Sequence, residues 1–263
     1  MGLFSFLFKR SKPVIGLCLG SGGAKGFAHL GALKAFEDLH ITFDVVGGTS
    51  IGSIIGAFYA DGYTVTDING LLGSLNIKEM LTGLPINMDM SGINKNIDRA
   101  IGGKSIEELA KPFVCVATDI DTFEEVVFTS GKVGTAVSAS SCYLPYFRPV
   151  VDTEGRRLID GAYVNSIPAD RVKDLGADYI ISVDLSAFTE KDFKNKQFPG
   201  ASDNPSEQGY KHSDIMITPN LKNYKATNVF ARHDMYELGY NAVMTRADEI
   251  KLGLKNAKKR KTK

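Results

Sequence analysis

The chain has 263 residues, of which 43% are hydrophobic and 23% are charged, enough for one large α/β domain or two small ones. No run of 18 apolar residues occurs, so we expect no membrane-spanning helix. Cys18, Cys115 and Cys142 show neither CxxC nor CxxH spacing. They are predicted to be small core residues in a reducing compartment rather than a disulfide or a metal site.

The net charge of +1 conceals an uneven distribution. Basic residues, and no acidic ones, occur in segments 1–12 and 251–263. Without these ten basic residues the remaining body carries a net charge of −9. Two interpretations stay open: both basic ends contact an anionic membrane, with the apolar residues 1–8 adding burial, or both are disordered and solubilising. We therefore divide the chain into an apolar and basic segment (1–13), a main domain (14–250) and a basic tail (251–263).

The main domain alternates strand-like and helical patterns. The predicted strands are Val14–Leu19, Phe43–Val46, Pro112–Asp119, Glu125–Phe128, Arg157–Asp160, Tyr179–Leu185 and Asp214–Ile217. The predicted helices are Gly26–Leu39, Ile51–Ala60, Thr66–Leu75, Ile93–Ala100, Ile106–Leu109, Val133–Ser140, Pro168–Leu175 and Thr227–Leu252. This order predicts an α/β fold of three α/β/α layers. The central sheet should be mixed but mainly parallel, because Asp121-Thr122 joins two strand-like runs in an antiparallel pair.

Two segments interrupt the alternation. Residues 186–213 are long and polar, and we expect a mobile loop there. Residues 77–93 are irregular but apolar, and they include Met80, Met88 and Met90. Flexible thioether side chains suit a surface that adapts to a hydrophobic ligand, so this segment is a candidate acyl-chain wall or lid. The alternative is a loop packed against the core.

Residues Gly48-Thr49-Ser50-Ile51-Gly52 form a G-x-S-x-G sequence between a predicted strand and a predicted helix. This context is typical of a nucleophile elbow, in which glycines permit a sharp turn and the serine hydroxyl is exposed. The positive end of the following helix favours a developing anion at the same place. The alternative is an ordinary strand–helix turn with a serine N-cap.

A glycine-rich loop, Gly20–Gly26, follows the first predicted strand. A dinucleotide fingerprint requires glycine where this chain has Lys25, and a phosphate loop requires the lysine after the last glycine. Neither pattern fits. A loop of backbone donors for an oxyanion does fit, since adjacent parallel strands deliver both loops to one edge of the sheet.

Three motifs in order make the chain resemble the bacterial form of the patatin-like phospholipase family over residues 14–250. Gly22-Gly23-Ala24-Lys25-Gly26 is similar to the family's oxyanion loop, Gly48–Gly52 to its elbow, and Asp160-Gly161-Ala162 to its D-G-[GA] motif. The run Ser138-Ala139-Ser140-Ser141, with Pro145, Phe147 and Pro149, also resembles the family's stretch before that aspartate.

The resemblance implies a Ser–Asp dyad without histidine, in which Asp160 is the base for Ser50. Gly22, Gly23, Ala24, Lys25 and Gly26 would form the oxyanion hole. A carboxylate is a weak base for an alcohol unless burial raises its pKa. Two alternatives stay open: Asp160 is a turn residue before Gly161, or a triad uses His212 or His233.

The expected function is a serine lipid acyl hydrolase, of phospholipase A or lysophospholipase type, that needs no cofactor and no metal. Its partner is a lipid acyl ester. Nucleic acid is not expected, because the basic tail lacks interleaved aromatic residues and the body is acidic. The expected location is the cytoplasm, peripheral on the inner face of a membrane. A regulatory or adaptor protein on the same fold, or a thioesterase or transacylase using the same site, are the alternatives. Head group, acyl length and oligomeric state stay open.

Overall fold

The computed structural model describes residues 12–74, 88–185 and 200–261. Its central sheet has the order β5-β6-β3-β2-β1-β7-β8, and β4 also pairs with β3. The strands are β1 (Ile15–Leu19), β2 (Val45–Gly48), β3 (Phe113–Asp119), β4 (Glu125–Phe128), β5 (Val150–Val151), β6 (Arg157–Asp160), β7 (Tyr179–Val183) and β8 (Ile215–Ile217). The seven predicted strands are confirmed; β5 was not predicted, because two residues are too few to show an alternating pattern.

The sheet is mixed, as predicted. β2, β1, β7 and β8 run parallel to their neighbours, and β2 is also parallel to β3. The pairs β3–β4, β3–β6 and β5–β6 are antiparallel. Asp160 therefore reaches the site from a strand that runs opposite to β1 and β2, and no sequence pattern indicates that pairing.

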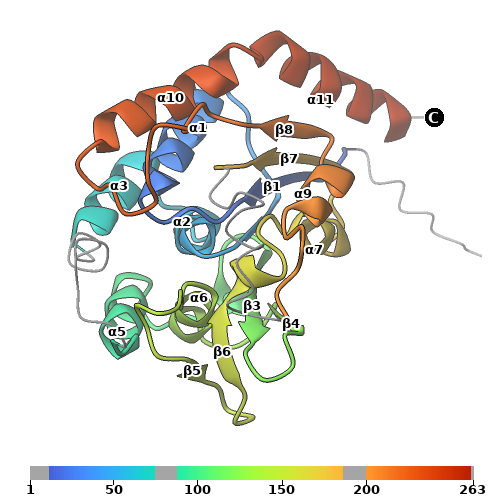
Figure 1. Cartoon of the computed structure of the whole chain (residues 1–263). Helices are drawn as coiled ribbons and strands as arrows, with labels where there is room; N and C mark the ends of the chain where they lie inside the picture. Colours follow the sequence, from blue (N-terminus) through green and yellow to red (C-terminus); the bar gives the residue numbers. More distant parts are fainter. Residues whose placement is uncertain (1–11, 75–87, 186–199, 262–263) are drawn as a thin grey trace, which may run out of the picture.

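Helices cover both faces of the sheet (Figure 1). The α-helices are α1 (Phe27–Asp38), α2 (Ile51–Ala60), α3 (Val65–Ser74), α5 (Ser91–Ala100), α6 (Val133–Ser140), α7 (Ala169–Asp174), α9 (Glu207–His212), α10 (Arg232–Met244) and α11 (Ala247–Lys261). The short 3₁₀ helices are η1 (Gly23–Gly26), η2 (Ile106–Glu108) and η3 (Gly161–Tyr163). Strand alternation explains the layers: Leu17 and Leu19 of β1 pack with α1 and α2, whereas Cys18 packs with Val172 of α7.

The C-terminal region differs from the prediction in two ways. The single helix expected over 227–252 is wrong, since α10 begins at Arg232 and the chain bends before α11. The Thr245 hydroxyl donates to the carbonyl of Asn241 at 2.9 Å, and bonds of this i−4 type bend helices. α11 extends to Lys261 and buries Ile250 and Ala257, so the basic tail is helical as far as Lys261 and the predicted boundary at 250 falls inside α11.

The two irregular segments are described only in part. Residues 186–199 lie outside the described residues, and the loop prediction is wrong for Glu207–His212, which form α9. This short helix is too polar for a clear hydrophobic period, and it packs through Gly209 against Ile167. Residues 75–87, most of the methionine-rich segment, also lie outside the described part. Met88 forms a bridge with Phe147, and Met90 is buried.

The packing of α10 on α1 depends on glycine. A Cβ atom added at Gly239 would lie 1.9 Å from the carbonyl oxygen of Ala28, and one at Gly31 would lie 1.9 Å from that of Tyr236. The two helices therefore touch backbone to backbone, which only glycine permits. This contact places α10 across α1, as Figure 1 shows. The loop before α10 in turn reaches the glycine-rich loop after β1.

Candidate active site

The candidate site lies where the carboxyl ends of β1 and β2 meet. β1 leads into the glycine-rich loop and η1, and β2 leads into Ser50 and α2. The two loops are in direct contact, since a Cβ atom at Gly26 would lie 2.3 Å from Cγ1 of Ile51. One at Gly52 would lie 2.1 Å from the carbonyl oxygen of Leu19. The glycines predicted from the motifs therefore permit the close approach of loop and elbow.

Ser50 has the backbone strain of a nucleophile elbow. Its φ is +56° and its ψ is −127°, and the helix α2 begins at the next residue. A left-handed φ is costly for a side chain with a Cβ atom, so the surrounding contacts must hold it. The backbone N–H of Ser50 donates to Oγ of Ser140 at 2.9 Å. A Cβ atom at Gly48 would lie 2.4 Å from the carbonyl oxygen of Gly52, which closes the turn tightly.

The structure brings together Ser50 and Asp160, which lie 110 residues apart in the sequence. The Ser50 hydroxyl donates to Oδ2 of Asp160 at 2.6 Å. Oδ1 of Asp160 accepts the N–H of Ala162 at 2.9 Å, which leaves the carboxylate oriented by both oxygens. Asp160 is 1% exposed and Ser50 is 8% exposed. The arrangement joins a hydroxyl to an acceptor that can take its proton.

The environment of Asp160 makes its carboxylate a stronger base. Burial raises the pKa of the Asp160 carboxyl from 3.8 to about 7, although hydrogen bonds from Ser50 and Ala162 act in the opposite direction. Near neutral pH, a base with this pKa is available in its ionised form and accepts a proton more readily than an exposed carboxylate.

Within the glycine-rich loop, the backbone donors differ in availability. The N–H of Ala24 donates to the carbonyl of Ala226 at 2.7 Å, and that of Lys25 donates to Gly22 at 3.1 Å. Among the described residues, no acceptor pairs with the N–H of Gly22 or Gly23. Gly23 has φ +55°, the left-handed conformation that glycine adopts without strain. Of the predicted oxyanion residues, Gly22 and Gly23 are therefore the available donors.

The remaining loop residues have packing roles. The buried Lys25 places its Nζ 3.5 Å from the carbonyl of Leu185, and Gly26 makes room for Ile51. His29 is fully buried beneath the loop and its Nε2 lies 2.7 Å from the carbonyl of Gly20. Burial lowers the pKa of His29 to about 4, so the neutral imidazole donates through Nε2 to that carbonyl.

No histidine of the described ranges hydrogen-bonds Ser50 or Asp160. His212 lies at the end of α9, and His233 is exposed in the first turn of α10. His29 contacts Gly20, and the exposed His40 follows α1. The triad alternative thus has no support from the geometry of these residues.

Two supporting residues were missed from the sequence. Oγ of Ser140 accepts a hydrogen bond from the N–H of Ser50. The backbone carbonyl of Asn165 accepts a hydrogen bond from the Thr49 hydroxyl. The serine-rich run 138–141 was a usable signal for the first. No signal indicated the second, because a threonine before Ser50 and an asparagine after the D-G-A motif are unremarkable in sequence.

The described residues hold no group of three His, Cys, Asp or Glu side chains arranged to bind a metal ion. Within the same residues, no helix combines the length and the apolar character needed to cross a bilayer. The three cysteines are free and buried, as predicted for core residues.

Comparison with family models supports the motif-based interpretation. The model described as "Patatin-like phospholipase" matches residues 17–173. The chain belongs to the patatin-like phospholipase family. The match contains the glycine-rich loop, the elbow and the D-G-A motif.

Several named relatives are 36% identical to this chain over the aligned segment. "Neuropathy target esterase sws" of Drosophila melanogaster is 36% identical over 191 residues, which cover 69% of this chain and 13% of the relative. "Patatin-like phospholipase domain-containing protein 6" of Homo sapiens is 36% identical, covering 68% and 14%. "Lysophospholipase nte1" of Aspergillus fumigatus is 36% identical, covering 67% and 12%. The matched part of this chain thus spans a small part of each relative's length.

Solved structures share the fold. VipD from Legionella pneumophila aligns with a TM-score of 0.62 at 16% identity, covering 90% of this chain and 67% of VipD. Human GIVD cytosolic phospholipase A2 aligns with a TM-score of 0.55 at 13% identity, covering 98% and 62%. The three-layer α/β/α architecture predicted from the sequence is therefore confirmed.

Proposed function

We propose that this protein is a serine lipid acyl hydrolase, a phospholipase A or lysophospholipase-like esterase that uses a Ser50–Asp160 dyad. The observation that carries the proposal is the buried 2.6 Å hydrogen bond from Ser50 to Asp160, beside a loop with two available N–H donors. Family membership and the names of the relatives, which include an esterase and a lysophospholipase, support the substrate class.

In the proposed reaction, Asp160 accepts the hydroxyl proton while Ser50 Oγ bonds to the ester carbonyl carbon. The carbonyl oxygen becomes an oxyanion that the N–H groups of Gly22 and Gly23 stabilise, with the N-terminus of α2 alongside. The intermediate collapses, the ester C–O bond breaks, and the leaving alcohol takes the proton from Asp160. Water then gives a proton to Asp160 and attacks the acyl-enzyme, which releases the fatty acid and returns the proton to Ser50.

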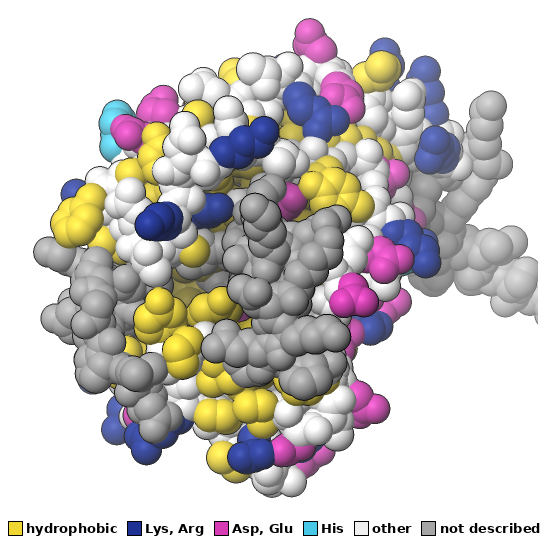
Figure 2. All heavy atoms as spheres, viewed as in Figure 1, with side chains coloured by type: hydrophobic (Ala, Val, Ile, Leu, Met, Phe, Trp, Pro, Cys, Tyr) yellow, Lys and Arg dark blue, Asp and Glu magenta, His cyan; other side chains and the backbone are white. Residues whose placement is uncertain are grey.

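Aromatic and hydrophobic side chains gather beside the dyad, which suits a lipid substrate. Tyr163, three residues after Asp160, stacks on Tyr143 with 5.7 Å between ring centroids, and Tyr143 stacks on Tyr146 at 6.2 Å. On the face shown in Figure 2, hydrophobic side chains gather over α6 and β6, the elements that carry Ser140 and Asp160. We assign this surface to contacts with the acyl chain; the methionine-rich segment 77–93 remains a proposed part of it.

Labelling with a lipid-like fluorophosphonate tests the nucleophile directly. We expect one phosphonyl group per chain, attached to Ser50, and no label on Ser50→Ala. Ser50→Ala should also lose hydrolysis of acyl esters by about 10³-fold or more while unfolding at the same temperature as the wild type. Hydrolysis retained by Ser50→Ala would overturn the proposal.

A panel of acyl substrates separates the alternatives, because all of them share the acyl-enzyme step. Turnover of thioesters or acyl transfer to an alcohol in preference to phospholipid hydrolysis would favour a thioesterase or transacylase. Complete labelling of Ser50 without turnover of any acyl substrate would favour a regulatory or adaptor role.

We further propose that the protein acts in the cytoplasm, peripheral on the inner face of a membrane, with both basic ends contacting anionic lipid. Free buried cysteines are consistent with a reducing compartment. The α11 helix presents basic side chains together with Leu252, which is 58% exposed. Such a combination of charge and apolar surface favours an anionic bilayer.

Vesicle binding tests the membrane contact. Truncation at residue 251 would remove Ala257 from the core, so substitution is the better design. Removing residues 1–12 and replacing the exposed Lys251, Lys255 and Arg260 with Gln should strongly weaken salt-sensitive binding to anionic vesicles. A matched control replaces the exposed Lys95, Lys173 and Lys211 with Gln and should bind like the wild type. Equal binding by both variants would contradict the assignment.

A further inference from the structure

Two hydrogen bonds join the same pair of segments at the candidate site, residues 49–50 and 160–165. One is the bond between Ser50 and Asp160. The other runs from Oγ1 of Thr49 to the backbone carbonyl of Asn165 at 2.9 Å. Thr49 is fully buried and Asn165 is 3% exposed, so water does not compete for this bond. The second bond therefore links both halves of the dyad without using a reacting atom.

Each segment is internally rigid. The N–H groups of Val164 and Asn165 both donate to the carbonyl of Gly161, at 3.1 and 2.9 Å. Asn165 thus closes a turn that begins at Gly161, the residue directly after Asp160. On the other side, the N–H of Thr49 donates to the carbonyl of Leu19 at 3.1 Å, which fixes the elbow to the end of β1. A displacement of Asn165 would therefore act on Asp160 through this short turn.

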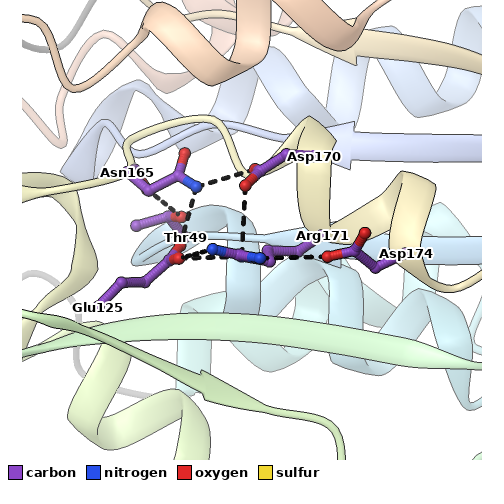
Figure 3. Close-up of polar contacts among 6 residues, drawn as sticks. All are labelled: Thr49, Glu125, Asn165, Asp170, Arg171 and Asp174. Atoms are coloured by element: carbon purple, nitrogen blue, oxygen red, sulfur yellow. Dashed lines mark hydrogen bonds and ion pairs between the residues drawn. The ribbon is translucent and has the colours of Figure 1, made fainter.

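The side chain of Asn165 is held by two carboxylates (Figure 3). Its Nδ2 donates to Oε1 of Glu125 at 2.8 Å and to Oδ1 of Asp170 at 2.9 Å. Over the described residues its Oδ1 has no hydrogen-bond partner, so the two hydrogen bonds from Nδ2 alone orient the amide group. A primary amide supplies both donors from one nitrogen, whereas aspartate here would place a third negative charge between the two carboxylates.

Arg171 of α7 holds those carboxylates in place. Its Nε donates to Oε2 of Glu125 at 2.9 Å and lies 3.3 Å from Oδ2 of Asp170, and its Nη2 also bonds Glu125. The side chains of Glu125 and Asp170 are only 16% and 15% exposed, so these ion pairs are screened less than surface pairs. The cluster of Glu125, Asp170 and Arg171 therefore ties β4 and α7 to Asn165.

We infer that Thr49 and Asn165 are positioning residues that keep Asp160 in register with Ser50, and that the ion-pair cluster positions Asn165. The inference deepens the proposed function and rests on it. When Ser50 gives its proton to Asp160 and bonds to the acyl carbon, the hydrogen bond between them is lost. The bond from Thr49 to Asn165 persists through this step and keeps Asp160 within reach of the water that completes the reaction.

Paired substitutions of Thr49 test the inference. Thr49→Val keeps the branched shape but removes the donor, and Thr49→Ser keeps the donor. With a soluble short-chain ester, we expect Thr49→Val to lower kcat about 10- to 100-fold and to change KM less than about twofold. Thr49→Ser should restore kcat to within about threefold of the wild type. Fluorophosphonate should still label every chain of Thr49→Val, but at a correspondingly lower rate, which separates misalignment from partial unfolding.

Arg171→Gln tests the ion-pair cluster against a matched control. Arg157→Gln removes an exposed pair with Asp121 from β6, the strand that carries Asp160, without touching Asn165. We expect a reduced labelling rate for Arg171→Gln and a wild-type rate for Arg157→Gln. In the variant with both Thr49→Val and Arg171→Gln, the labelling rate should fall by less than the product of the two single reductions, since both substitutions act through Asn165.

Three results would overturn the inference: wild-type labelling and turnover by Thr49→Val, equal slowing by Thr49→Val and Thr49→Ser, or fully multiplicative effects of Thr49 and Arg171. Failure of the proposed function is a different observation, namely hydrolysis that survives Ser50→Ala. The two outcomes are therefore distinguishable.

Discussion

Replacement of Asp160 by Asn is expected to lower ester hydrolysis by about 10²- to 10⁴-fold, the range lost when a general base is removed. Asparagine keeps the shape of the side chain, accepts the N–H of Ala162 and donates to Ser50, but it takes no proton. The measurement is kcat/KM for a soluble ester. Residual activity above about one per cent would show that another group is the base.

The same variant should be more stable than the wild type at alkaline pH. The folded pKa of Asp160, about 7, lies above its ordinary value of 3.8, so the folded state holds this proton more tightly than the unfolded state. The contribution of this carboxyl group to the free energy of unfolding is fully present below pH 3.8 and is lost as the pH rises through about 7. Above that pH the ionised carboxylate costs about 4 kcal/mol, a cost that Asp160→Asn avoids.

Urea unfolding at two pH values checks this expectation. Asp160→Asn should exceed the wild type in free energy of unfolding at pH 8, and the difference should vanish toward pH 4. Loss of activity combined with a gain of stability is the expected signature of a buried base retained for chemistry. A variant that is less stable than the wild type at both pH values would contradict it.

The pH dependence of turnover is the second large effect. Asp160 must be ionised to accept the Ser50 proton, and burial raises the pKa of its carboxyl to about 7. We therefore expect kcat/KM to rise about tenfold per pH unit below that value and to level off above it. At pH 5 the rate should be about 100-fold below the plateau.

A histidine base could give a similar midpoint, so the control removes the histidines that the triad alternative would use. The variant with both His212→Ala and His233→Ala should keep the wild-type midpoint and plateau. Burial lowers the pKa of His29 to about 4, which places its titration well below this midpoint. A midpoint that shifts or disappears in the double variant would restore the triad.

The sequence by itself determined the elements and the motifs that lie next to each other in the chain. Hydrophobic patterns predicted every described strand except β5, and G-x-S-x-G predicted the elbow at Ser50, because a strand, a glycine turn and a helix are local features. The prediction was least accurate where local signals are weak, as at the two-residue β5 and the polar α9. It also missed the break between α10 and α11 near Thr245, because the hydrophobic pattern continues across it.

Only the tertiary structure decided which distant groups meet. The antiparallel pairing of β6 with β3 brings Asp160 to Ser50, 110 residues away, and burial there raises the pKa of the carboxyl. Within the described ranges, the N–H groups of Ala24 and Lys25 have acceptors and those of Gly22 and Gly23 do not, and Thr49 meets Asn165 across 116 residues. Desolvation and hydrogen-bond occupancy depend on everything that surrounds a group, so the motifs name the candidate residues but not the environment that raises the pKa of Asp160.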